Sequence, residues 1–133
     1  MDLYSDGAAR GNPGEAGGGI VLEDGKKTIE KFVYFGKKTN NESEYLALIE
    51  GLKLAAEKGA KTLAIHMDSE LIVKQLRGEY KVKNERLIVL HRQAMKLLNS
   101  IEWSAKHIKR EKNKRADFLA NLAIDSSSSP KMS

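Results

Sequence analysis

The sequence predicts an α/β domain in which helices pack on a mixed β-sheet. Two observations carry this prediction. The chain reads as three strands followed by helices and further strands, in the order β-β-β-α-β-α-α-β-α. A helix precedes the fourth strand, which favours a right-handed crossover that makes strands one and four parallel neighbours. At 133 residues, the chain is long enough for one domain with one hydrophobic core.

An antiparallel meander of three short strands is expected first. Its strands are predicted at 3–6, 20–23 and 27–36. The first two strands are joined by a long glycine-rich turn, GAARGNPGEAGGG (7–19), in which proline followed by glycine favours a tight turn. The second connection is a hairpin turn at Asp24-Gly25.

The pattern of the remaining sequence predicts four helices and two further strands. Helices are expected at 39–56, 69–78, 84–100 and 116–124, and strands at 62–68 and 101–109. The first helix begins with a capping box formed by Thr39 and Glu42, and Gly59 closes it. We expect residues 1–125 to form the domain and the serine-rich tail at 126–133 to be disordered.

Four acidic residues occupy positions that such a fold could bring together. Asp6 and Asp68 end strands one and four, so their carboxylates lie side by side if these strands are neighbours. Glu44 lies on the crossover helix, on the face that also carries Leu48. An unpaired buried carboxylate is costly, so this position indicates a partner. Asp117 begins the last helix, just after the fifth strand.

Clustered carboxylates repel one another unless a cation joins them. Mg²⁺ binds a few carboxylates and takes its remaining ligands from water and substrate phosphate, and a pair of such ions supports phosphodiester hydrolysis. Structural explanations stay open for three of the acids: Asp6 can start an Asx-turn, Asp68 can cap the next helix, and Asp117 is favoured near a helix N-terminus. Glu44 lies past the first turn on the apolar face, where no such explanation applies.

The charge and composition of the chain favour some classes of function and exclude others. The net charge is +5, and residues 71–133 carry 14 basic against 6 acidic side chains, whereas residues 1–70 carry 9 against 12. A basic half favours nucleic acid as a partner, although a lysine-rich surface also aids solubility. The chain has no cysteine, which excludes disulfides and thiolate metal sites. No segment has the features of a membrane helix or signal peptide, so we expect a cytoplasmic protein.

Four segments together resemble the ribonuclease H type 1 family. They are YSDGAARGNPG (4–14), TNNESEYLAL (39–48), MDSELIV (67–73) and KREKNKRADFLAN (109–121). The similarity runs from residue 2 to about 124, with the segments in the family's order. It implies the ribonuclease H-like fold, with a five-stranded mixed sheet in the order 3-2-1-4-5, strand two antiparallel, and helices on both faces.

The resemblance also implies an activity. It places the family's catalytic and metal-binding carboxylates at Asp6, Glu44, Asp68 and Asp117, the same acids that the topology groups. The implied reaction is endonucleolytic hydrolysis of the RNA strand of RNA–DNA hybrids, which leaves 3′-hydroxyl and 5′-phosphate ends. The implied cofactor is Mg²⁺, as two ions with substrate bound, or Mn²⁺. A monomer with no obligate protein partner is expected.

Substrate contacts follow from the same resemblance. It places Asn12 and Thr39 near a DNA-strand phosphate, and Asn40 and Asn41 in the minor groove. Backbone groups around the first glycines, together with Glu44, are expected to sense the RNA 2′-hydroxyls. The full set of expected substrate-binding residues is Gly7, Ala8, Gly11, Asn12, Thr39, Asn40, Asn41 and Ser69.

Two departures from the family pattern concern the second half of the chain. Residues 77–87 lead almost directly into the next long helix, without the basic helical handle that many members carry. The stretch KHIKREKN (106–113) lacks the glycines of the loop that carries a catalytic histidine in other members. His107 and Arg110 are therefore rival candidates for that role.

Two other functions stay open from the sequence. One is a module that binds the hybrid with weak or no cleavage, and the presence of all four acids argues against it. The other is the same chemistry on double-stranded RNA, against which the pair Asn40-Asn41 and the turn GNPG favour the hybrid.

Overall fold

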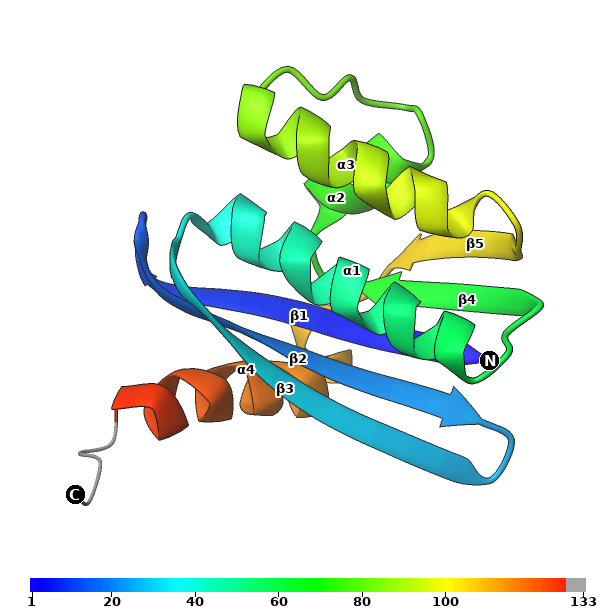
Figure 1. Cartoon of the computed structure of the whole chain (residues 1–133), viewed down its shortest axis with the longest axis horizontal. Coiled ribbons are helices and arrows are strands. Elements are labelled where there is room, and N and C mark those ends of the chain that lie inside the picture. The colour runs from blue at the N-terminus through cyan, green and yellow to red at the C-terminus, as the bar shows by residue number, and fades with distance from the viewer. Residues whose placement is uncertain (129–133) are drawn as a thin grey trace.

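The computed structural model describes residues 1–128, which form a five-stranded sheet between two layers of helices (Figure 1). The strands are β1 (Asp2–Gly11), β2 (Gly14–Asp24), β3 (Lys27–Lys38), β4 (Thr62–Met67) and β5 (Glu102–His107). The helices are α1 (Asn40–Glu57), α2 (Glu70–Leu76), α3 (Glu85–Leu98) and α4 (Lys114–Ser128), with a short 3₁₀ turn η1 (Arg110–Lys112).

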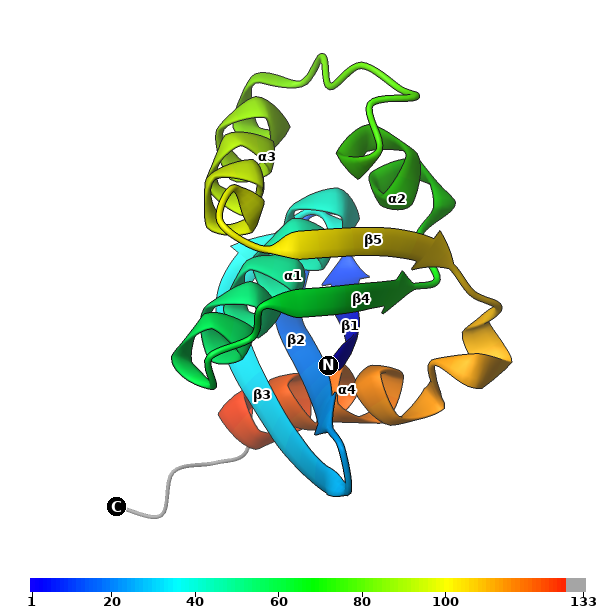
Figure 2. The ribbon, with the colours of Figure 1, turned by 90° about the vertical axis from the view of Figure 1, so that its right-hand side faces the viewer.

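The sheet has the order β3-β2-β1-β4-β5, which confirms the expected topology. β2 pairs antiparallel with β1 and β3, whereas β1–β4 and β4–β5 are parallel. Helices α1, α2 and α3 lie on one side of the sheet and α4 on the other (Figure 2). β1 continues to Gly11, beyond the end of β4, whose His66 pairs with Tyr4. Asp6 therefore lies within β1, beside the carboxyl end of β4, and the prediction that it ends the first strand was wrong.

The glycine-rich segment is not the long turn that the sequence predicts. β1 continues to Gly11 and β2 begins at Gly14, so only Asn12 and Pro13 connect them, through a cis peptide bond. The glycines belong to the strands because α4 packs directly on them: a Cβ at Gly19 would lie 1.9 Å from the carbonyl oxygen of Ala116. The prediction was wrong because glycine was taken as a turn signal rather than as a surface for close packing.

Helix α1 begins with the expected capping box. The Thr39 hydroxyl accepts a hydrogen bond from the Glu42 N–H at 3.1 Å, and the Glu42 carboxylate accepts one from the Thr39 N–H at 2.9 Å. The inner face of the helix buries Leu48 and Leu52 against the sheet, next to Leu3 of β1. This packing fixes the depth at which the first turns of α1 cross the end of β1.

Several other boundaries differ from the sequence prediction. α2 ends at Leu76 rather than at 78, and β5 ends at His107 rather than at 109. The hairpin between β2 and β3 turns at Gly25-Lys26, one residue later than expected, with Gly25 at φ 64°. α4 begins at Lys114 and continues to Ser128, so residues 126–128, expected in a disordered tail, are helical. The rest of that tail, 129–133, lies outside the described residues. Among residues 1–128, no helix is both long and apolar enough to cross a membrane.

Candidate active site

The contact between β1 and α1 depends on Gly7. A Cβ at this position would lie 2.2 Å from the carbonyl carbon of Ser43 and 2.4 Å from the nitrogen of Glu44. The missing side chain lets the helix backbone rest on the strand, and the Gly7 N–H donates a hydrogen bond to the Glu44 carboxylate. Gly7 therefore sets both the position of the helix and the direction of the Glu44 side chain.

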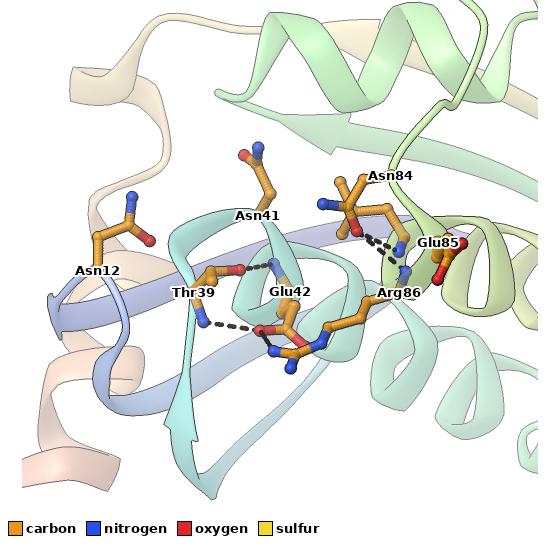
Figure 3. Close-up of a pocket in the computed structure, with 8 residues that line it drawn as sticks. Asn12, Thr39, Asn41, Glu42, Asn84, Glu85 and Arg86 are labelled. Atoms are coloured by element: carbon orange, nitrogen blue, oxygen red, sulfur yellow. Dashed lines mark hydrogen bonds and ion pairs between the residues drawn. The ribbon is translucent and has the colours of Figure 1, made fainter.

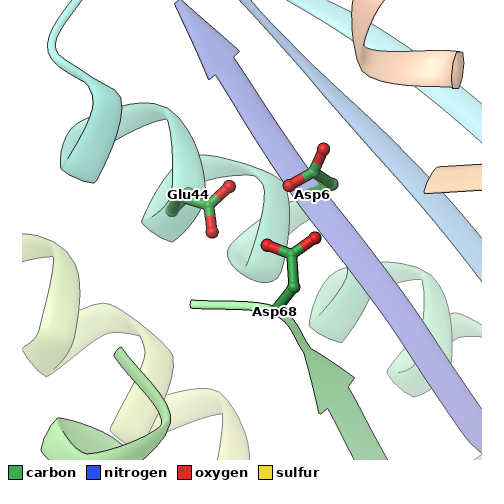
Figure 4. A group of neighbouring side chains, drawn as sticks. All are labelled: Asp6, Glu44 and Asp68. Atoms are coloured by element: carbon green, nitrogen blue, oxygen red, sulfur yellow. The ribbon is translucent and has the colours of Figure 1, made fainter. Parts of the chain in front are cut away.

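Three carboxylates meet at this crossing (Figure 4). Asp6 comes from β1, Glu44 from α1, and Asp68 directly follows β4; one oxygen of each lies within 4.8 Å of the others. Asp6 is 6% exposed and Glu44 8%. The topology argument thus grouped these three acids correctly, and Glu44 points toward Asp6 and Asp68 rather than into the apolar core.

Burial makes this cluster unfavourable when it is fully ionised. Burial raises the pKa of Asp6 well above its ordinary value, and the charge of Glu44 raises it further. Burial also raises the pKa of Glu44, although hydrogen bonds from a protonated Asp6 and from the Gly7 N–H act in the opposite direction. In the absence of a cation, the two carboxyl groups therefore retain a proton between them at neutral pH.

The fourth expected acid, Asp117, lies at the margin of the cluster. It stands in the first turn of α4, and its carboxyl group also contributes to the raised pKa of Asp6. The Asn121 side-chain amide donates to Asp117 Oδ1 at 3.4 Å. Asp117 is thus close to Asp6 but is not part of the compact group of three.

A buried amide that the sequence analysis missed supports Asp68. Asn113, which is 2% exposed, donates from Nδ2 to the Ser5 carbonyl at 3.0 Å and to Asp68 Oδ2 at 3.4 Å. It bridges β1, the residue after β4 and the start of α4. The only signal in the sequence was its position just before a predicted helix, where asparagine is common as a cap.

The two rival residues after β5 face different partners. His107 is exposed, and its Nδ1 lies 3.9 Å from Glu70 Oε2 on α2. Arg110 lies in η1, and its positive charge lowers the pKa of Glu44 against the effect of burial. Arg110 therefore acts electrostatically on the carboxylate cluster, whereas His107 faces Glu70 of α2.

A pocket of about 490 Å³ opens beside the cluster, between the start of α1 and the start of α3 (Figure 3). It includes Asn12, Thr39 and Asn41, which were expected to contact substrate. Asn84 and Arg86 also line it and were not anticipated. The Asn84 carboxamide caps α3 by accepting from the backbone N–H groups of Arg86 and Leu87 at 3.0 and 3.2 Å.

The remaining expected substrate residues are spread around this edge. Asn40 donates its backbone N–H to Asn12 Oδ1 at 3.1 Å, which ties the β1–β2 turn to α1. Ser69 caps α2 by accepting from the Ile72 N–H at 3.4 Å. Ala8 lies in β1 and Gly11 ends it with φ 115°. The N–H of Gly7 is already used by Glu44 and is not free for substrate.

The donor set fits a hard divalent cation. All three clustered ligands are carboxylate oxygens, which Mg²⁺ and Mn²⁺ prefer. A cation between them would also remove the repulsion that raises the pKa of Asp6. The site therefore suits a cation because three carboxylates are crowded together, and not because of any single ligand.

Comparisons with known proteins agree with this geometry. The profile of a family described as reverse transcriptase-like matches residues 4–123. Ribonuclease HI of Halobacterium salinarum is 42% identical over 128 residues, which cover 94% of this chain and 64% of that protein. The bifunctional protein Rv2228c of Mycobacterium tuberculosis is 40% identical over 131 residues, covering 92% of this chain and 35% of that protein. The crystal structure of LC11-RNase H1 in complex with RNA/DNA hybrid matches with a TM-score of 0.91 and 42% identity, covering 96% of this chain and 99% of that one.

The sheet order and the cluster of acids define a protein of the ribonuclease H-like fold. The chain belongs to the reverse transcriptase-like family and, within it, to the ribonucleases H of type 1 that lack the helical handle. Within the described residues, α2 leads to α3 through residues 77–84 without a further helix. The chain spans 64% and 35% of the lengths of the two curated relatives named above.

Proposed function

We propose that the chain is a metal-dependent ribonuclease H that cleaves the RNA strand of RNA–DNA hybrids endonucleolytically, leaving 3′-hydroxyl and 5′-phosphate ends. The observation that carries the proposal is the group Asp6, Glu44 and Asp68, which gathers where the end of β4 meets β1 and α1, in a chain of the type 1 family. The similarity to LC11-RNase H1, which was solved with an RNA/DNA hybrid, supports the choice of substrate.

The three clustered acids, with Asp117 beside them, would hold the cation. Bound divalent ions, two with substrate present, would supply an activated water and charge stabilisation at the scissile phosphate. The protein keeps the carboxylates in place through the Gly7 N–H on Glu44 and the Asn113 amide on Asp68. Because these contacts are preformed, the site needs little rearrangement to accept a cation.

The pocket at the start of α1 would position the duplex. Its side-chain amides and hydroxyl, at Asn12, Thr39 and Asn41, offer donors for phosphate oxygens and base edges. Arg86 adds a cation at the same rim, with 76% of its side chain exposed. Glu44, which lies between this pocket and the other acids, is the acceptor best placed to meet an RNA 2′-hydroxyl.

Cleavage assays test the proposal directly. Labelled hybrid, double-stranded RNA and double-stranded DNA are incubated with the protein and Mg²⁺, with and without EDTA. We expect cutting of the RNA in the hybrid alone, and none in EDTA. Absence of cutting with any divalent metal would refute the enzymatic proposal, and equal cutting of double-stranded RNA would refute the substrate.

Isosteric substitution tests the site. Asp68→Asn removes a charge at almost constant volume and should lower the cleavage rate by a factor of about 10³ or more. Asp24→Asn, the same change at the exposed end of β2, is the matched control and should cleave as the parent does. A near-parental rate for Asp68→Asn would show that the cluster is not the active site.

Arg110 and His107 can be separated in the same assay. Arg110→Ala should reduce the rate more than His107→Ala, because the Arg110 charge acts on Glu44 whereas His107 faces Glu70. The reverse order would assign the role to the histidine.

A further inference from the structure

A row of three side chains crosses the sheet on the face opposite α1. Tyr4 of β1 is paired in register with His66 of β4, and His66 with Lys106 of β5. Residues directly opposite on parallel strands point to the same face. The rings of Tyr4 and His66 stack with centroids 4.5 Å apart and an interplanar angle of 14°. The Asp2 carboxylate accepts a hydrogen bond from His66 Nε2 at 2.9 Å, which fixes the imidazole.

Helix α4 covers only the Tyr4 end of this row, because Tyr4 packs against Val21 and against Ala116 and Leu119 of α4. It packs mainly on β2 and also on β1 and β3, and β4 and β5 are not among its main contacts within residues 1–128. Figure 2 shows the chain leaving β5, passing through η1 and reaching α4 on the other side of the sheet. A hollow of about 390 Å³ lies between this row and the segment that follows β5.

The lining of this hollow is aromatic and basic. It consists of Tyr4, His66, Lys106, His107, Ile108, Lys109 and Lys112, without a carboxylate. The three lysines are exposed, and none of them forms an ion pair with an acidic side chain in the described part of the chain. Arg115, in the first turn of α4, differs from these lysines because it pairs with Glu30. The hollow therefore presents three lysines without an acidic partner among the described residues, beside an aromatic stack that Asp2 holds through His66.

We propose that this open face of β1, β4 and β5 binds single-stranded nucleic acid. An unpaired base stacks against the Tyr4–His66 pair, and the adjoining phosphates lie against Lys106, Lys109 and Lys112. Aromatic surface for bases combined with lysines for the backbone is the chemistry by which single strands are held without sequence preference. A duplex does not fit this arrangement, because its bases are already stacked on one another.

The position of this face links it to the carboxylate cluster. Tyr4 precedes Asp6 by two residues on β1, and His66 precedes Asp68 by two on β4. A nucleic-acid strand that leaves the carboxylate cluster past the end of β5 therefore reaches the three lysines without crossing the pocket at the start of α1. The proposal concerns binding alone and does not depend on cleavage of the hybrid.

Fluorescence anisotropy with a labelled 12-nucleotide oligomer, tested both as oligo-dT and as oligo-U, measures this binding in EDTA at low salt. The variant carries Lys106→Glu and Lys112→Glu, which leave the half-buried rings of Tyr4 and His66 unchanged. The matched control carries Lys26→Glu and Lys61→Glu, the same change of charge at the other end of the sheet. We expect affinity at least about tenfold lower for the variant and unchanged for the control. Equal affinities of variant and control would overturn the proposal.

Photocrosslinking locates the bound base. An oligomer with 5-iodouridine is irradiated with the protein, and tryptic peptides are analysed by mass spectrometry. A crosslink on the peptide that contains Tyr4 or His66 is expected, whereas crosslinks confined to 12–41 or 84–86 would overturn the assignment. The variant should cleave hybrid within about twofold of the parental rate, and a parallel loss of cleavage would place the lysines on the duplex-binding surface instead.

Discussion

At the scale of single residues, Asp6 and Glu44 show how burial and charge oppose each other. Burial raises the pKa of Asp6 above the value of about 4 that an aspartate has in the unfolded chain, and the charge of Glu44 raises it further. At this group the metal-free native state therefore binds more protons than the unfolded state above about pH 4. The contribution of Asp6 to the free energy of unfolding falls as the pH rises from there, since unfolding then releases a proton.

Asp6→Asn tests this opposition. The substitution keeps a group that can donate to Glu44 but needs no proton, whereas the parent must take up a proton on folding at pH 8. The metal-free variant should therefore be more stable than the parent at pH 8 by at least about 1 kcal/mol, the value of one pKa unit. The difference should shrink toward pH 4. Thermal unfolding in EDTA at several pH values measures it, with Asp24→Asn as the control for the same change at an exposed site. A variant less stable than the parent at pH 8 would contradict the argument.

The acids and Asn113 also show which parts of the site the sequence could predict. Asp68 was predictable because it follows a strand, and Glu44 because it stands on the apolar face of a helix. Asp6 was grouped with them on the expectation that the first strand ends there, although β1 continues to Gly11. Asn113 was not, because its partners Ser5 and Asp68 lie 108 and 45 positions away in the sequence. An amide becomes a structural bridge only through the fold, and no local pattern distinguishes it from a helix cap.

At the scale of elements, the strand β2 shows a limit of local patterns. Gly17 and Gly19 receive the backbone of α4, and on the opposite face Gly18 lies under Phe35 and Ala47. The sequence predicted the strand order and the helices, whose periodicity is local. It misassigned 7–19 because the reason for the glycines is a helix about 100 residues later.

Gly19→Ala measures the contact between β2 and α4. The added methyl group would lie 1.9 Å from the Ala116 carbonyl oxygen, and backbone cannot move aside as a flexible side chain can. We expect a loss of about 2 kcal/mol or more in the free energy of unfolding. Gly25→Asn is the comparison, because Gly25 has open space and asparagine tolerates its positive φ. Urea denaturation that gives equal losses for both would show that α4 does not press on the strand.

The contribution of the capping box to the stability of helix α1 can be measured separately from any contact of Thr39 with substrate. Thr39→Ala removes the acceptor for the Glu42 N–H and should cost about 1 kcal/mol, whereas Thr39→Ser keeps the hydroxyl and should cost far less. Urea denaturation gives the stability of each variant. If Thr39 also contacts the hybrid, Thr39→Ala should raise KM, and Thr39→Ser should restore it.

At the scale of the whole molecule, the distribution of charge separates the binding of a polyanion from the binding of a cation. The net charge of +5 favours a polyanion as partner, yet the point where the sheet, α1 and the start of α4 converge is acidic and buried. The fold brings these acids together at a cost in stability that a bound cation would offset. Stability and metal binding are therefore linked properties of the entire domain, because only the folded state assembles the cluster.

Metal addition provides the corresponding measurement. A cation that binds the folded state alone stabilises it by mass action, by about 2.7 kcal/mol at a concentration 100 times its Kd. Saturating Mg²⁺ should therefore raise the Tm of the parent protein measurably. In Asp68→Asn the rise should be much smaller, because one of the three clustered ligands loses its charge. Asp24→Asn should respond as the parent does. A parent Tm that is unchanged in saturating Mg²⁺ would mean that the carboxylates do not act together as a metal site, even though they lie within 4.8 Å of one another.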